Sequence, residues 1–200
     1  MVRQVEDFAS YAQFDFMDGH FVPSRSVNDK DMASIPIKFK WEAHLMVEKP
    51  AESFASFKRL GASKVIFHYE ATPSPEEVIR QARELSLAVG VALNPNTPVS
   101  SVLPLVNKLD SILFMTVVPG FYGSKFLPQV TEKIASFRRL YPTFNIGVDG
   151  GINSNNIALV ACTGVDDICV GSAIFLQPSP IESYHHLQSL AEEALKQRRN

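Results

Sequence analysis

The chain has few cysteines and little excess charge, and both shortages narrow the classes of protein to which it can belong. Its two cysteines, Cys162 and Cys169, are separated by six residues, without a CxxC or mixed His/Cys ligand pattern. We therefore expect two reduced, buried thiols rather than a disulfide or a zinc site, which favours the cytoplasm. The 19 basic and 21 acidic residues give a net charge of −2, and the basic side chains are dispersed. This balance predicts no nucleic-acid partner.

The sequence also lacks the long apolar segments that membranes require. No uninterrupted apolar run approaches the ~18 residues of a membrane span, and the opening MVRQVEDF holds no apolar signal region. We therefore expect no membrane partner and no export. What the chain does have is 46% hydrophobic residues over a length of 200, which is enough for one substantial core. We expect a single domain over residues 1–200.

Short apolar runs alternate with longer amphipathic stretches along the chain. Strands are predicted at 11–16, 39–47, 64–68, 88–93, 111–117, 145–149 and 167–171. Helices are predicted at 2–10, 50–60, 75–87, 99–108, 126–140, 154–162 and 181–197, with Ser154 as the N-cap of the sixth. The strand ends recur about every 26 residues. This repeat of strand and helix predicts a parallel α/β barrel of the TIM (β/α)₈ type.

One strand of that barrel is missing from the pattern. Seven strands are visible where the barrel needs eight, although the chain opens on a predicted helix and closes on another. The absent element is the first β-strand, whose end would fall about ten residues before Met1. We expect a shortened barrel, with an open sheet as the alternative. Loss of the strand exposes the edges of its neighbours, which invites a partner strand or a homo-oligomer.

Polar side chains recur where the predicted strands end. Asp15 lies inside an apolar run, and Asp149 ends another run before two glycines, although burying an unpaired charge costs several kcal/mol. Because the carboxyl ends of barrel strands meet at one rim, these acids are expected to lie close to His44. The three side chains form a ligand set for zinc, iron(II), manganese or cobalt. A satisfied core histidine is the alternative for His44. The full set at strand ends is Asp15, His44, His68, Asn94, Thr116 and Asp149.

Glycine clusters follow the last three predicted strands. They comprise Gly120 and Gly123, the pair Gly150 and Gly151, and Gly171. Glycine lets backbone N–H groups approach an anion, and the loops after the last strands of such barrels frequently hold a phosphate. The clusters together therefore predict a phosphorylated small-molecule ligand, although a tight turn is the better explanation of any single glycine.

Seven motifs in fixed order resemble the ribulose-phosphate 3-epimerase family. They are DFMDGHFVP, HLMV, FHYEA, ALNPNTP, FMTVVPGFYG, VDGGIN and VGSAIF, from about residue 13 to residue 175. The resemblance implies a divalent-metal enzyme of the pentose phosphate pathway. Such an enzyme interconverts D-ribulose 5-phosphate and D-xylulose 5-phosphate by removing and returning a proton at C3, through an enediolate that a metal stabilises.

The resemblance also implies roles for individual residues. The two acid/base groups are Asp15 and Asp149, which are metal ligands together with His44. Three methionines, Met17, Met46 and Met115, cap the reacting carbons, although composition alone would make them core filler. The residues that would bind substrate or its phosphate are His44, Gly120, Phe121, Tyr122, Gly123, Gly150, Gly151, Ile152, Gly171 and Ser172.

The chain departs from the family pattern at several positions. Gln13 stands where the family has a histidine ligand, and we expect its amide oxygen to be a weak metal ligand. The absent first strand carries a serine that touches substrate in the family. Tyr122 and Ser124 replace the usual glycine and glutamine, and Tyr122 either narrows the pocket or covers the barrel mouth. Near the site, Asp18 is expected to tie down its loop, and His68 with Glu70 to support or pack rather than to bind metal.

Two alternatives to the pentose epimerase stay open. One is an epimerase for a related ketose phosphate such as allulose 6-phosphate, because a longer sugar changes the depth of the pocket more than the chemistry. The other is a weakly active or inactive sugar-phosphate-binding homologue. The acid-x-Lys-x-x-Asp pattern of related decarboxylase and synthase barrels is absent after Asp15.

Overall fold

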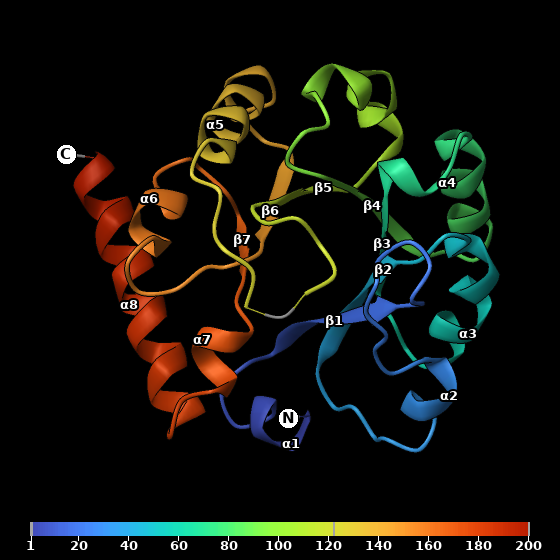
Figure 1. Cartoon of the computed structure of the whole chain (residues 1–200), viewed down its shortest axis with the longest axis horizontal. Helices are drawn as coiled ribbons and strands as arrows, with labels where there is room; N and C mark the ends of the chain where they lie inside the picture. Colours follow the sequence, from blue (N-terminus) through green and yellow to red (C-terminus); the bar gives the residue numbers. More distant parts are fainter. Residues whose placement is uncertain (1, 122, 200) are drawn as a thin grey trace.

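A computed structural model gives the fold for residues 2–121 and 123–199. Seven strands, all parallel and hydrogen-bonded in sequence order, form a nearly closed barrel (Figure 1). They are β1 (Tyr11–Met17), β2 (Lys40–Met46), β3 (Lys64–His68), β4 (Ala88–Leu93), β5 (Ser111–Met115), β6 (Asn145–Asp149) and β7 (Asp167–Cys169). The shortened TIM-type barrel that the repeat predicted is confirmed.

Helices surround the barrel on the outside, as Figure 1 shows for α3 to α6 and α8. The α-helices are α1 (Val2–Val5), α2 (Asp29–Met32), α3 (Phe54–Arg59), α4 (Pro75–Glu84), α5 (Val130–Leu140), α6 (Ile157–Ala161), α7 (Ser172–Phe175) and α8 (Pro180–Arg199). Short 3₁₀ helices are η1 (Pro50–Ser53), η2 (Tyr69–Ala71), η3 (Val99–Ser101) and η4 (Leu103–Lys108). The described helices include none that is both long enough and apolar enough to span a bilayer.

Alternation along each strand separates two environments. In β2, Trp41 and Leu45 are buried in the large core between barrel and helices, where Trp41 meets Phe57 of α3 edge-on. The intervening His44 points the other way, into the lumen of the barrel, because successive side chains of a strand face opposite sides. A smaller apolar cluster fills the lumen and includes Ile66, Ala92, Leu113 and Met115. Lumen side chains near the carboxyl ends of the strands therefore form the floor of the site.

The barrel is open at one seam. β1 pairs with β2 and β7 pairs with β6, and within residues 2–121 and 123–199 no ladder joins β7 to β1. Both strands are more exposed than the strands between them, and Tyr11 of β1 is 39% exposed. The seam lies where an eighth strand would close the barrel.

Several predicted element boundaries are wrong for local reasons. The helix expected at 99–108 is two 3₁₀ turns, because Pro104 lacks the N–H that a continuous helix would use. The helix expected from residue 126 begins at Val130, since Leu127 N donates to Thr116 O and commits the chain to a loop. Ser154 is not an N-cap, as α6 begins after Asn156.

The thiols differ from expectation in one respect. Both cysteines are free, as predicted, but Cys162 is exposed rather than buried. It directly follows the last turn of the short helix α6, where the chain turns toward β7. Cys169 is partly buried and faces the lumen.

Candidate active site

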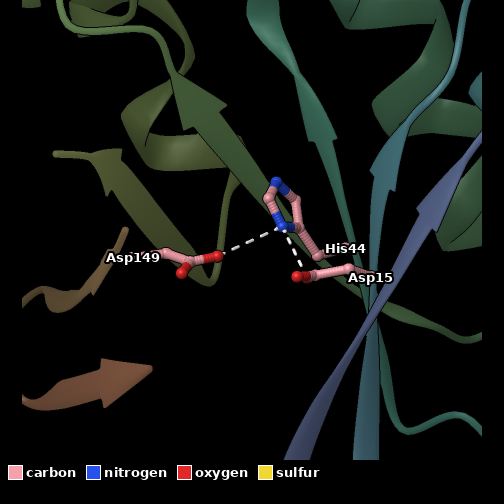
Figure 2. Close-up of side chains that lie close together, drawn as sticks. All are labelled: Asp15, His44 and Asp149. Atoms are coloured by element: carbon pink, nitrogen blue, oxygen red, sulfur yellow. Dashed lines mark hydrogen bonds and ion pairs between the residues drawn. The ribbon is translucent and has the colours of Figure 1, made fainter. Parts of the chain in front are cut away.

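Three side chains from three strands converge at the mouth of the barrel (Figure 2). Asp15 of β1 and His44 of β2 are register partners, so their side chains leave neighbouring strands side by side. Nδ1 of His44 lies 3.0 Å from Oδ1 of Asp15 and 3.4 Å from Oδ2 of Asp149. The ligand atoms of the three residues all lie within 4.8 Å of one another. The expected convergence of Asp15, His44 and Asp149 is confirmed.

The electrostatics of this cluster favour a bound cation. Burial opposes a charge on His44, but hydrogen bonds to Asp149 and Asp15, with the charges of both, raise its pKa to about 10. Burial, and then the charge of Asp15, raises the pKa of Asp149. Two carboxylates brought together in a partly buried place need a compensating positive charge, which a protonated His44 or a bound metal ion supplies. Carboxylate oxygen and imidazole nitrogen are also the donors that borderline divalent metals prefer, so the residues present fit a metal ion.

Gln13 occupies the centre of the cluster with its nitrogen. Its Nε2 donates to Oδ2 of Asp149 at 2.8 Å and to Oδ1 of Asp15 at 3.0 Å, and lies 3.3 Å from Nδ1 of His44. Its Oε1 accepts a hydrogen bond from Sγ of Cys169 at 3.2 Å. The expected ligand atom of Gln13 therefore faces away from the three other ligands in this conformation. The amide would have to turn over to offer its oxygen to a metal.

A second histidine lies behind the first. His68 is fully buried, and its Nε2 lies 3.0 Å from Nε2 of His44. Burial lowers the pKa of His68 to about 4, despite the neighbouring Glu70 carboxylate. His68 lies behind His44 and outside the group of ligand atoms that Asp15, His44 and Asp149 form among the described residues.

The three methionines share the lumen face with the site. Met17 and Met46 are register partners that follow Asp15 and His44 by two residues, and Met115 is the register partner of Asp149. Met46 and Met115 are almost completely buried. The methionines thus lie around the cluster, as the resemblance implied, and their capping role stays a prediction.

The glycine-rich loops meet at the same rim. Gly150 and Gly151 directly follow Asp149 and have φ values of +117° and +65°. A Cβ on Gly151 would lie 2.8 Å from the carbonyl oxygen of Ser124, in the loop after β5. Gly171 precedes the short helix α7, which begins at Ser172. The close packing of these loops requires glycine, and their phosphate-binding role stays a prediction.

The remaining predicted substrate-binding residues differ in solvent exposure and in backbone conformation. Phe121 is 62% exposed on the loop after β5, whereas Ile152 is buried below the glycine pair. Gly120 and Gly123 both have positive φ, and Tyr122 between them lies outside the described residues.

The Asp18 side chain holds the loop after β1 in place. Its carboxylate accepts hydrogen bonds from the backbone N–H groups of His20, Phe21 and Glu48. Burial raises the pKa of Asp18, but these hydrogen bonds outweigh it and lower the pKa below its usual value. The expectation that Asp18 ties down its loop is confirmed.

One contributor, Cys169, was not identified from the sequence, and for another, Thr116, the role was not predicted. Cys169 contacts Gln13, and the only available signal was its position at a strand end. Thr116 donates its hydroxyl to the carbonyl oxygens of Asp149 and Gly150, which fixes the backbone that carries the acid. Its place directly after a strand was the signal, although no hydrogen-bond partner could be assigned.

Fold and cluster together define a class of protein. A parallel barrel with acids and a histidine at the carboxyl ends of its strands is the arrangement of a TIM-barrel enzyme. Comparison with known proteins narrows the class. The profile of the ribulose-phosphate 3 epimerase family matches residues 2–175, and the chain belongs to this family.

Individual relatives agree with that assignment. Ribulose-phosphate 3-epimerase of Schizosaccharomyces pombe is 37% identical over 96% of this chain and 86% of its own length. The cytoplasmic isoform of Oryza sativa is 36% identical over 95% of this chain and 86% of its own. In structure the chain is similar to 3-hexulose-6-phosphate synthase from Salmonella typhimurium, with a TM-score of 0.69, 19% identity and coverage of 96% and 91%, which supports the fold.

Proposed function

We propose that the protein interconverts D-ribulose 5-phosphate and D-xylulose 5-phosphate by inverting C3. The observation that carries this proposal is the convergence of two carboxylates, from β1 and β6, on one buried histidine, in a chain whose relatives are named ribulose-phosphate 3-epimerase. The epimerase reaction needs one group to remove a proton from one face of C3 and another to return a proton to the opposite face. A pair of carboxylates on separate strands is suited to both tasks.

The proton balance assigns complementary states to the two acids. One carboxylate takes the C3 proton, and the electron pair of the C–H bond moves into an enediolate across C2 and C3. The other acid, protonated at the start, gives its proton to C3 from the opposite side. Each acid thereby exchanges its protonation state, and proton exchange with water restores the pair. A positioned acid or base contributes roughly 10²–10⁴-fold to such a step.

A divalent metal ion fits the same residues. Asp15, His44 and Asp149 would hold it, with Gln13 as a fourth and weaker ligand after its amide turns over. A bound metal ion supplies Lewis-acid stabilisation of negative charge that develops on oxygen, worth several kcal/mol. Among zinc, iron(II), manganese and cobalt, the donor set selects none.

The remaining residues orient the substrate and exclude water. The glycine loops at 120–123, 150–152 and 171–172 would bind the phosphate through backbone N–H groups, with Phe121 and Ser172 beside it. Met17, Met46 and Met115 would cover the planar intermediate with thioethers, which supply no competing proton. His44, which is fully buried, would act on the substrate through the metal ion that it holds.

Partners and location follow as further proposals. The partner is a small ketose phosphate, and the open seam between β1 and β7 favours a homo-oligomer. The free cysteines and the name of the rice relative, a cytoplasmic isoform, favour the cytoplasm. The whole chain would act as one barrel domain.

Product analysis tests the function and its alternatives. With metal supplied, ¹³C NMR of ribulose 5-phosphate should reveal xylulose 5-phosphate, at a rate well above that with allulose 6-phosphate. Faster turnover of the hexose phosphate would support the related epimerase. If both sugars bind but neither is turned over, the protein is the inactive homologue. The observation that favours this alternative is the position of the Gln13 amide nitrogen at the centre of the cluster.

A further inference from the structure

The contact between His44 and His68 determines which ring nitrogen of His44 is available to a metal ion. Both rings are fully buried, and their Nε2 atoms are 3.0 Å apart. Only one proton can lie between two nitrogens at this distance, so one ring donates and the other accepts. The ring of Phe21 packs over His68 with centroids 4.9 Å apart, so its surroundings on that side are apolar.

The far side of His68 decides the direction of this hydrogen bond. Nδ1 of His68 lies 3.5 Å from Oε2 of Glu70. Among residues 2–121 and 123–199, Nδ1 of His68 and the buried Oδ1 of Asn94 are both without a hydrogen-bond partner, so the Glu70 carboxylate is the charged group that faces this nitrogen. A carboxylate and an amide oxygen are both acceptors, so Nδ1 of His68 carries the ring proton. Nε2 of a neutral His68 is then a lone pair that accepts from His44.

This direction fixes the tautomer of His44. With its Nε2–H donated to His68, His44 would bind a metal ion through Nδ1, and the metal would take the place of the proton that Asp149 and Asp15 favour there. Nδ1 faces Oδ1 of Asp15 and Oδ2 of Asp149, at 3.0 Å and 3.4 Å. Three electron-pair donors thus point at one place, which suits a metal ion.

The outer end of the chain of hydrogen bonds is anchored. Oε1 of Glu70 accepts the backbone N–H of Asn94 at 2.9 Å and also the hydroxyl of Thr97. Nζ of Lys133 donates to the carbonyl oxygens of Asn94 and Pro95, at 3.0 Å and 3.3 Å. Glu70 therefore has little freedom to leave His68, and the orientation of both rings is held from β3 and the loop after β4.

We propose that His68 is a positioning residue, which together with Glu70 holds His44 in the tautomer whose Nδ1 binds the catalytic metal. The proposal rests on the metal site of the proposed function and adds a chain that runs from Glu70 through His68 and His44 to the metal. Groups that orient a metal-bound histidine in this way typically change metal affinity by 10- to 100-fold when they are removed.

The test compares two replacements of His68 in the full chain with Co²⁺ as the probe. His68→Leu removes the acceptor, whereas His68→Gln can offer an amide oxygen to Nε2 of His44. We expect His68→Leu to weaken Co²⁺ binding 10- to 100-fold in a chelator competition and to alter the visible spectrum of bound Co²⁺. His68→Gln should restore most of the affinity, and Glu70→Leu should show a smaller loss in the same direction. His186→Leu, on the exposed side of α8, is the matched control and should bind as wild type.

The outcomes distinguish failure of the proposed role of His68 from failure of the proposed metal site. Wild-type affinity and spectrum in His68→Leu, with exchange of the C3 proton intact in wild type, would overturn the role of His68 and leave the epimerase standing. No Co²⁺ binding by wild type would instead overturn the metal site itself. If His68→Leu does not fold, His68→Gln and Glu70→Leu decide: a 10- to 100-fold loss in His68→Gln, or no loss from Glu70→Leu, would contradict the proposal.

Discussion

The amide nitrogen of Gln13 lies 2.8 Å from Oδ2 of Asp149, at the place where the ligand atoms of the site converge. The nitrogen supplies hydrogen-bond donors to two carboxylates that would otherwise repel each other. A metal ion that binds there must displace the amide nitrogen of Gln13. The amide oxygen, which stands where the family pattern implies a histidine, would stabilise the bound metal less than a ring nitrogen does. We therefore expect Gln13 to lower the metal affinity of this chain in two ways.

Replacing Gln13 by histidine should tighten metal binding. Gln13→His offers a ring nitrogen in place of the amide, and we expect the dissociation constant for Zn²⁺ to fall by about tenfold or more. A chelator-competition titration measures it, with Gln4→His on the exposed helix α1 as the control. Unchanged affinity would mean that Gln13 lies outside the coordination sphere.

Removing the charge of Asp18 should destabilise the loop after β1 in a pH-dependent way. The folded pKa of Asp18 is lowered, so its carboxylate stabilises the protein above the unfolded pKa, and this contribution is lost as the pH falls through the acid range. We expect Asp18→Asn to cost about 1 kcal/mol at pH 7, a figure reduced for solvent screening, and less near pH 3. Urea unfolding at both values measures this, beside Asp7→Asn. An equal cost at both pH values would contradict the assignment.

A methyl group on Gly151 should impair the phosphate site as well as stability. Its φ of +65° and the 2.8 Å approach to the carbonyl oxygen of Ser124 predict backbone strain and a shifted loop. Gly151→Ala should lower the free energy of unfolding by roughly 1–2 kcal/mol and raise KM for the sugar phosphate. Gly61→Ala, with a φ of +89° but no close contact, should lose stability while KM stays unchanged. A normal KM in Gly151→Ala would remove this loop from the phosphate site.

The open seam should promote self-association. The free edges of β1 and β7 offer unpaired backbone groups, so we expect the 200-residue chain to oligomerise in analytical ultracentrifugation. A version extended before Met1 by one strand should pair there, with a higher Tm. If the 200-residue chain is monomeric and as heat-stable as the extended version, the seam is not a defect of the barrel.

The sequence predicted strands more accurately than helices. Three strands, β3, β4 and β6, match their predicted bounds, and their apolar residues are buried. Helix starts depended on tertiary hydrogen bonds, such as the one from Leu127 to Thr116, which no local pattern reveals.

The position of the site was predictable from the sequence, but the tertiary contacts of its side chains were not. Acids in apolar runs and the barrel repeat predicted the convergence of Asp15, His44 and Asp149. The orientation of the Gln13 amide depends on Cys169, which lies on the other edge strand, β7, and is far from Gln13 in the sequence. The link from His44 to His68 likewise depends on the packing of two rings in the lumen, so neither was accessible from residue order.

Solvent exchange at C3 of ribulose 5-phosphate tests the central claim most directly, because it reports proton removal by the two acids. In D₂O with metal supplied, the wild-type protein should incorporate deuterium at C3. Asp15→Asn and Asp149→Asn should each lower the rate by roughly 10²–10⁴-fold, whereas Asp7→Asn should leave it unchanged. Exchange at the wild-type rate in either site variant, or none above background in wild type, would contradict the two-carboxylate epimerase.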